Sequence, residues 1–225
     1  MPTNSLVVAL ALLGFLAEAV ALEKPDTTQR WQQAILPLSV PVERRQHQQR
    51  RALTEDCSAT LIATRPVRLL SAWHCFDGYN DLTKPPLVTT PAGTMALRLI
   101  ASGGSMLADW ALLEAASPTI DASLSKLPSL AVAPLQDMPN APVMMAGFSH
   151  VSGDQHRQLR ADMRCKATTL GSHWVSSDCL AYKGASGGPV IQKINNDWRV
   201  VGVVSARDDS GTRLFTPVPQ RLLNR

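Results

Sequence analysis

Two signals are missing from most of this sequence: the long periodicity of amphipathic helices, and, beyond the N-terminus, any uninterrupted apolar run that could cross a bilayer. The first absence gives no support to a mainly helical chain. The second leaves only the N-terminus as a candidate membrane or export segment. With 225 residues, 45% apolar and 18% charged, the composition is that of a globular protein. The chain is long enough to bury a core, as one domain or two small fused ones.

A strong excess of charge is also missing. The net charge is +4 and the isoelectric point is about 9.1, which is only mildly basic. Binding of nucleic acid would need these charges gathered on one face. The most basic run, ERRQHQQRR at residues 43–51, fits a nucleic-acid arm, a processing site or a solvated segment. No aromatic side chains interleave its charges, which favours the last two. We therefore expect no nucleic-acid partner.

The N-terminus has the pattern of a signal peptide. Residues 6–20 are apolar apart from Gly14 and Glu18, and residues 19–21 read Ala-Val-Ala, a small-x-small pattern suited to signal peptidase. The alternative is a membrane anchor, but the run is shorter than the roughly 20 residues that a span needs. We expect residues 1–21 to be removed and the protein to be secreted or periplasmic. Residues 22–51 are polar and rich in proline, and are expected to form an N-terminal segment or a propeptide.

The four cysteines include no Cys-x-x-Cys pair. A zinc site from Cys57, His74 and Cys75 is conceivable, but adjacent His and Cys side chains rarely face one tetrahedral ion. After export, an even number of cysteines favours disulfides. Four cysteines allow three pairings, of which the local one joins Cys57 to Cys75 and Cys165 to Cys179. No metal or organic cofactor is expected.

From residue 52 the sequence reads as many short β-strands, bounded by Gly, Pro, Asn, Asp and Ser. Residues 117–140 contain four prolines and are expected to connect two strand-rich halves, an arrangement typical of sandwiches or barrels. Residues 219–225 are expected to form a short terminal helix. The predicted strands are 58–64, 67–71, 87–90, 94–101, 110–114, 143–148, 159–168, 189–194, 198–206 and 212–218.

The strongest chemical signal is the segment GASGGPV at residues 184–190. A serine hydroxyl needs a base to become a nucleophile, and flanking glycines let backbone N–H groups converge on a developing oxyanion. The segment also fits the Gly-x-Ser-x-Gly elbow of α/β-hydrolases, which place their Asp and His after the serine. No histidine follows Ser186, because the last is His173. The base must therefore lie upstream.

Two upstream segments supply suitable partners. Residues 69–75 read as a buried strand that runs into His74 and Cys75, and Asp109 enters the apolar strand at 110–114. A carboxylate beside a buried strand is costly unless it is hydrogen-bonded, and orienting an imidazole is one such use. The order His74, Asp109, Ser186 is the chymotrypsin order and differs from that of subtilisin.

These segments resemble the His-Cys, Asp-x-Ala-Leu-Leu and Gly-x-Ser-Gly-Gly-Pro motifs of trypsin-like, chymotrypsin-fold serine peptidases, over residues 57–218. Cys179 is most similar to its counterpart in the compact bacterial secreted members. The resemblance implies an all-β fold: two antiparallel six-stranded Greek-key β-barrels, with the active site between them and a short C-terminal helix. The barrels would cover residues 52–125 and 126–225.

The resemblance also implies the activity, a secreted serine endopeptidase that acts through an acyl-enzyme on Ser186. His74 would serve as general base, and Asp109 would hold its tautomer. The N–H groups of Gly184 and Ser186 would form the oxyanion hole. The partners would be protein or peptide substrates. We expect a monomer that does not remain inserted in a membrane after signal cleavage.

Four positions bear on specificity or depart from the family. Ser205 resembles the strand that pairs with the substrate backbone, and Arg213 aligns near the floor of the primary pocket. A cation there would favour acidic side chains, although Arg213 pointing to solvent is the alternative. Ala185 replaces the aspartate that in trypsin pairs with a new N-terminus, so we expect no such switch. Trp73 replaces a small residue, which leaves open a catalytically inactive member of the fold that binds proteins.

Overall fold

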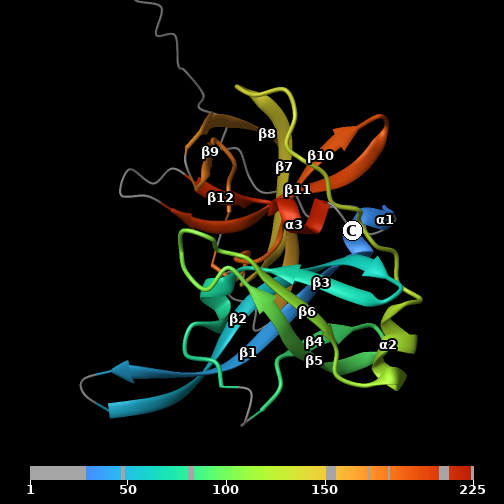
Figure 1. The fold of residues 1–225 in the computed structure, drawn as a ribbon, viewed down its shortest axis with the longest axis vertical. Coiled ribbons are helices and arrows are strands. Elements are labelled where there is room, and N and C mark those ends of the chain that lie inside the picture. The colour runs from blue at the N-terminus through green and yellow to red at the C-terminus, as the bar shows by residue number, and fades with distance from the viewer. Residues whose placement is uncertain are drawn as a thin grey trace, which may run out of the picture.

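The computed structural model describes residues 29–46, 49–80, 84–150, 156–171, 173–181, 183–207 and 213–223. The predicted signal peptide, residues 1–21, lies outside these ranges. Within them, no helix has both the length and the apolar character needed to cross a bilayer. The strands form two closed barrels, which lie one above the other in Figure 1 and confirm the predicted all-β fold.

The first barrel contains six antiparallel strands in the spatial order β1-β2-β3-β6-β5-β4. A short helix, α1 (Arg30–Gln33), precedes it, and a 3₁₀ turn, η1 (Trp73–Phe76), follows its third strand. Alternating burial in the β4 segment LVTT is what a pleated strand with one buried face requires. The strands are β1 (Ile35–Gln46), β2 (Gln49–Thr64), β3 (Val67–Ser71), β4 (Leu87–Thr90), β5 (Gly93–Ser102) and β6 (Ala111–Ala115).

The second barrel repeats this design in the order β10-β11-β12-β9-β8-β7. Helix α2 (Pro118–Leu124) lies in the connector between the barrels, and helix α3 (Gln220–Leu223) follows the last strand, as predicted for the C-terminus. The strands are β7 (Ala141–His150), β8 (Arg157–Leu170), β9 (Val175–Ser177), β10 (Pro189–Ile194), β11 (Asp197–Arg207) and β12 (Arg213–Pro217).

The first barrel begins earlier than predicted. The sequence assigned residues 22–51 to a polar segment outside the barrel, but β1 is one of its six strands, so the boundary at residue 52 is wrong. Pro37 and Pro41 concealed this strand, because proline removes a ladder donor. They lie opposite Ser58 and Thr54, and the Ser58 N–H points away from β1 to another acceptor. The prolines therefore occupy pairs that need no donor toward β2.

The two barrels are joined by the connector and by α3. In the connector, the Leu130 N–H donates to the Leu61 carbonyl of β2 at 2.9 Å. Three residues later, the Ala133 N–H donates to the Val200 carbonyl of β11. From the other end, the Arg221 guanidinium of α3 lies 3.8 Å from the ring centre of Trp110, beside the first barrel. The connector, which follows the first barrel, thus bonds to the second, and α3, which follows the second barrel, packs against the first.

A second link between the barrels is polar. Arg157 of β8 is largely buried, and its guanidinium donates to the carbonyls of Leu38 at 3.1 Å and Cys57 at 2.7 Å. It also donates to the Ser39 hydroxyl and pairs with the Asp56 carboxylate at 3.4 Å. Burial lowers the pKa of Arg157, and the Asp56 charge partly opposes this by raising it. This side chain fixes β1 and β2 against the second barrel.

Candidate active site

His74 lies in η1, and a disulfide fixes this turn. Cys75 is bonded to Cys57 on β2, and Cys165 is bonded to Cys179, which confirms the local pairing. Cys75 is fully buried while the His74 side chain keeps 22% of its surface exposed. Both sulfurs beside the imidazole are in the disulfide, so neither is available as the thiolate that a zinc site uses.

Asp109 immediately precedes Trp110 and β6, and it has no exposed surface. Its Oδ1 accepts from the His74 backbone N–H at 2.8 Å, and its Oδ2 lies 2.8 Å from His74 Nδ1. The hydroxyl of Ser205 on β11 also donates to Oδ2. These three donors offset the cost of burying a carboxylate. Because an ionised carboxylate only accepts, Nδ1 carries the proton and Nε2 is left as an acceptor.

Ser186 lies in the loop between β9 and β10, where glycines are required by the backbone and by close packing. Gly184 and Gly187 have φ angles of 98° and 79°, a region that other residues rarely adopt. A Cβ atom at Gly187 would lie 2.2 Å from the Ser71 hydroxyl oxygen and 2.4 Å from the Ser58 carbonyl oxygen. The loop therefore approaches the first barrel as closely as a backbone permits.

Backbone hydrogen bonds hold this loop between the two barrels. On one side, the Ser58 N–H of β2 donates to the Ser186 carbonyl at 2.7 Å. On the other, the Gly187 N–H donates to the Val204 carbonyl of β11, and the Val204 N–H donates to the Gly188 carbonyl, both at 2.9 Å. The position of Ser186 thus depends on strands from both barrels.

The structure brings His74 and Asp109 into direct contact, whereas Ser186 is linked to them only through neighbouring segments. Ser58, which holds the Ser186 carbonyl, is the chain neighbour of disulfide-bonded Cys57. Among the described residues, no hydrogen bond joins the Ser186 hydroxyl to His74, whose Nε2 lies 4.0 Å from the Cys75 sulfur. Such nucleophile–base bonds are often long in sites without substrate.

The backbone N–H groups of Gly184 and Ser186 are among those of the loop that have no acceptor in the described part of the chain. They are the pair predicted for the oxyanion hole. Gly184 packs tightly on β7, because a Cβ atom there would lie 2.7 Å from the Phe148 carbonyl oxygen. The two N–H groups are therefore held against β7, and no carbonyl of the described residues accepts from them.

Ser58 is a site residue that the sequence analysis missed. It is fully buried, its hydroxyl donates to the Gly184 carbonyl at 2.9 Å, and it accepts from the Phe148 N–H at 2.8 Å. Its carbonyl accepts from the Ser71 hydroxyl at 2.8 Å. The residue therefore joins β2, β3, β7 and the Ser186 loop. The partners of its hydroxyl lie 90 and 126 positions away, so no local pattern indicates this role.

The predicted specificity residues have contacts that sequence alone did not suggest. Ser205 is buried, and its side chain is bonded to Asp109, so it touches the His74 partner directly. Arg213 begins β12, and its Nε donates to the Ala181 carbonyl at 3.2 Å, three positions before Gly184. Residues 182 and 208–212, which flank these segments, lie outside the described ranges. The preference for acidic side chains stays a prediction.

Ala185 and Trp73, the two departures from the family, occupy different surroundings. Ala185 is 4% exposed and belongs to the apolar core of the second barrel. A Cβ atom on Gly147 would lie 2.6 Å from the Ala185 Cα, so β7 presses directly on this residue. Trp73 is only partly buried and lies in η1 beside His74.

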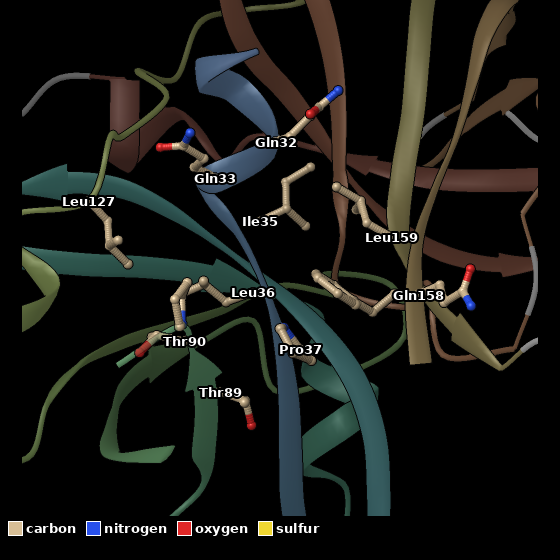
Figure 2. Close-up of a pocket in the computed structure, with 12 residues that line it drawn as sticks. Gln32, Gln33, Ile35, Leu36, Pro37, Thr89, Thr90, Leu127, Gln158 and Leu159 are labelled. Carbon is tan, nitrogen blue, oxygen red and sulfur yellow. The ribbon is translucent and has the colours of Figure 1, made fainter. Parts of the chain in front are cut away.

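An apolar cavity of about 490 Å³ lies elsewhere, between α1 and β1 of the first barrel and β8 of the second. Figure 2 shows Ile35, Leu36 and Leu159 around it. None of His74, Asp109 and Ser186 lines it, so it is separate from the candidate active site. Its lining residues are Gln32, Gln33, Ile35, Leu36, Pro37, Thr89, Thr90, Pro91, Leu127, Phe148, Gln158 and Leu159.

Comparison with known proteins adds a family match to this geometry. Residues 57–203 match the family model described as a trypsin-like peptidase domain. The matched range contains His74, Asp109 and Ser186 and omits β1. No curated protein matches the chain.

Solved structures with a similar fold include several bacterial proteases. The protease Anisep from Arthrobacter nicotinovorans has a TM-score of 0.66 at 16% identity, over 87% of this chain and 92% of that one. The active form of the Rv3671c protease from M. tuberculosis has a TM-score of 0.60 at 17% identity, over 84% and 77%. The HtrA-type protease AlgW, solved with a tripeptide, has a TM-score of 0.59 at 16% identity, over 87% and 59%. At these identities the likeness is one of fold.

Proposed function

The chain belongs to the trypsin-like peptidase family, and from this premise we propose that it is a serine endopeptidase acting through an acyl-enzyme on Ser186. The observation that carries the proposal is the buried Asp109 carboxylate, bonded twice to His74 beside the glycine-rich loop of Ser186. A fully buried carboxylate that accepts from an imidazole leaves Nε2 as a base at the surface of the site.

In the first half of the reaction, Ser186 Oγ attacks the scissile carbonyl carbon while its proton passes to His74 Nε2. Asp109 stabilises the resulting imidazolium. The oxyanion accepts hydrogen bonds from the N–H groups of Gly184 and Ser186. The tetrahedral intermediate then expels the amine, which takes the proton from Nε2 and leaves an ester on Ser186. Substrate must bring Oγ within about 3 Å of Nε2 for the transfer.

In the second half, water replaces the amine. His74 Nε2 takes a proton from water as it attacks the ester carbonyl, and the same N–H donors stabilise the second oxyanion. Collapse releases the carboxylic acid product and returns the proton to Ser186 Oγ. The proposed substrates are proteins or peptides, in keeping with AlgW having been solved with a tripeptide. No cofactor is needed for these steps.

We propose that activity needs no pairing of residue 185 with a new N-terminus. Ala185 lies in an apolar core and has no group that could bind an amine. A charged side chain in that core would be buried without a partner, at a cost of several kcal/mol. Removal of residues 22–51 would also delete β1, so a mature chain beginning at residue 52 is not compatible with a closed first barrel.

We also propose that the protein is exported, by cleavage of the signal after residue 21, to the cell exterior or periplasm. Two disulfides support this, because disulfides persist in oxidising compartments. N-terminal sequencing of the extracellular or periplasmic protein should give a chain beginning at Leu22. Recovery of only an uncleaved, reduced chain from the cytoplasm would contradict export without affecting the proposed activity.

The competing function is a protein-binding member of the fold without catalysis, which is favoured by the absent bond between Ser186 and His74 in the described residues. A fluorophosphonate probe separates the two, since only an activated serine reacts efficiently. Purified protein should be labelled and should cleave casein, whereas the Ser186→Ala variant should do neither. The Ser123→Ala variant, which changes an exposed hydroxyl on α2, should match wild type. Folded wild-type protein that is neither labelled nor active would favour the binding function.

A further inference from the structure

The outer ends of β1 and β2 form a two-stranded hairpin that projects from the first barrel (Figure 1). We call residues 43–46 and 49–52 the arginine hairpin. Its register places Arg44 opposite Arg51, and Arg45 opposite Arg50. Directly opposed side chains of an antiparallel pair share one face, and successive residues alternate between faces. Each face of the hairpin therefore carries one pair of arginines.

Within the part of the chain that the structure describes, three of these four charges are uncompensated. Arg44 pairs with Glu55 at 3.2 Å, but the side chains of Arg45, Arg50 and Arg51 have no ion pair or hydrogen bond there. All three are exposed. Like charges directly opposite each other destabilise an antiparallel pair. A bound anionic ligand would offset this repulsion, which favours binding of an anion to the hairpin.

The hairpin is continuous with the candidate active site. The Arg44 guanidinium donates to the His74 carbonyl at 3.5 Å, and the Glu43 N–H donates to the Gly78 carbonyl at 2.8 Å, just beyond η1. Farther along β2, Ser58 holds the Ser186 carbonyl. A single strand thus runs from the proposed nucleophile to the arginines.

One edge of that strand is open. β2 pairs with β1 over its whole outer length, but with β3 only from Thr60 onward. The Ser58 N–H points to this open edge, where it meets Ser186. Every second residue of a strand presents its N–H and C=O to the same edge. Positions 50, 52, 54 and 56 therefore face it too, and within the described ranges their main-chain groups have no partner there.

We propose that the arginine hairpin is a docking site for an acidic segment of the polypeptide substrate, which adds as a strand to the open edge of β2. The inference rests on the proposed endopeptidase function. Ser205 is expected on the acyl side of the cleft, so the segment along β2 belongs to the leaving-group side. Arg50 and Arg51 precede Ser58 by about 25 Å at roughly 3.3 Å per residue. The acidic side chains then lie about six to nine residues C-terminal to the scissile bond.

Exposed strand edges are also protected from aggregation by charged side chains. Protection from aggregation requires charged side chains but predicts no preference for acidic substrates. The test therefore compares peptides with one cleavable core and four glutamates placed six to nine residues after the scissile bond, four glutamines at the same positions, or four glutamates before it. Wild-type protein should cleave the first with a kcat/KM about tenfold above the other two, as expected for two or three exposed ion pairs. Raising the salt concentration should reduce the difference.

The Arg50→Gln/Arg51→Gln variant should lose this preference while it keeps wild-type labelling by fluorophosphonate and wild-type cleavage of the glutamine peptide. Its Tm should not fall, because a repulsion is removed. The Arg30→Gln/Arg65→Gln variant removes equal charge from two exposed positions elsewhere and should keep the preference. An active enzyme without the preference, or a preference that survives in the hairpin variant, overturns the proposal.

Binding gives a readout that does not depend on catalysis. Fluorescence anisotropy of the glutamate peptide should rise with the Ser186→Ala protein, and the hairpin substitutions should abolish the rise. Failure of labelling in wild type together with retained binding would reject the proposed activity and keep the docking site. Stronger hairpin-dependent binding to duplex DNA or to phosphatidylglycerol vesicles than to the peptide would overturn the proposal in favour of another polyanion.

Discussion

Asp109 shows how one side chain depends on two segments that are distant in sequence. Its oxygens accept from the His74 backbone, the His74 ring and the Ser205 hydroxyl, 35 and 96 positions away. The acceptor role toward Nδ1 fixes the imidazole tautomer. Because the tautomer leaves Nε2 free to accept the Ser186 proton, a substitution that reverses the tautomer without changing the shape of the side chain tests the role of Asp109.

The Asp109→Asn substitution should lower kcat by about 10⁴ with little change in fold. The amide has the same shape but offers an N–H group to Nδ1, which moves the imidazole proton to Nε2, where it blocks acceptance from Ser186. Steady-state kinetics on the purified variant, with circular dichroism as a folding check, measures the effect. Asp121→Asn, at a carboxylate that accepts from the Val67 N–H, serves as control. A kcat within tenfold of wild type would contradict the role given to Asp109.

Ser58 is a positioning residue in this scheme, because it acts on the oxyanion donors through the Gly184 carbonyl. The Ser58→Ala substitution leaves that carbonyl and the Phe148 N–H without their buried partner, and should destabilise the protein by about 1–3 kcal/mol. We also expect a lower kcat with a nearly unchanged KM, since the donors act in the transition state.

The matched control is Ser149→Ala on β7. The Ser149 hydroxyl is equally buried but has no hydrogen-bond partner in the described residues, so its loss should be neutral or stabilising. Urea unfolding and steady-state kinetics on both variants test the contrast. If Ser58→Ala lowered stability but left kcat at the wild-type value, Ser58 would be a structural residue only.

At the scale of elements, Glu114 of β6 joins three neighbouring strands. Its carboxylate pairs with Arg68 of β3 and Arg98 of β5. Burial raises the pKa of Glu114, but the hydrogen bonds and charges of Arg98 and Arg68 outweigh this and hold the pKa below its ordinary value of 4.5. A carboxyl whose pKa is lower in the folded than in the unfolded state stabilises the fold above the unfolded pKa.

This stabilisation should disappear on acidification, as pH falls through the folded pKa of Glu114. The Glu114→Gln substitution removes the charge at all pH values. We therefore expect the Tm difference between wild type and the variant to be constant above about pH 5.5 and to shrink as pH falls below 4.5. Thermal unfolding from pH 7 to pH 3 measures it. A Tm difference that does not change with pH would assign the effect to packing.

Elements with strong local patterns could be predicted, and those defined by distant partners could not. β3, β4 and β10 have the predicted bounds, because each is a short apolar or β-branched run between turns. β1 was missed because its prolines oppose the usual strand composition, and β9 because it has only three residues. Helix α2 was overlooked in a proline-rich connector, although Ser117 and Pro118 are a typical helix start.

The candidate site divides in the same way. The motifs around His74, Asp109 and Ser186 are local, so the sequence indicated them. The hydroxyls of Ser58 and Ser205 enter the site only because strands from two barrels meet there. Nothing in its neighbouring residues distinguishes Ser58 from an ordinary strand serine. The resemblance that singled out Ser205 assigned it to the substrate backbone and gave no sign of its bond to Asp109.

At the scale of the whole molecule, Arg157 couples the barrels. The Arg157→Gln substitution withdraws donors from the Leu38 and Cys57 carbonyls and should destabilise the protein by about 1–3 kcal/mol. We expect unfolding to become less cooperative, with tryptophan fluorescence and far-UV circular dichroism no longer changing at the same urea concentration. Arg199→Gln, at an exposed arginine bonded to Asp197, is the control. Coincident transitions at an unchanged midpoint would show that the Arg157 link between the barrels is dispensable.

The proposed catalytic groups are divided between the barrels, and this has a consequence for the newly made chain. His74 and Asp109 are synthesised with the first barrel, but Ser186 and the hydroxyl that completes the bonding of Asp109 follow 77 and 96 positions after Asp109. A chain that has folded only its first barrel thus holds a base without a nucleophile. On the proposed mechanism, proteolytic activity first arises when the second barrel has folded against the first, so partly folded chains are inactive.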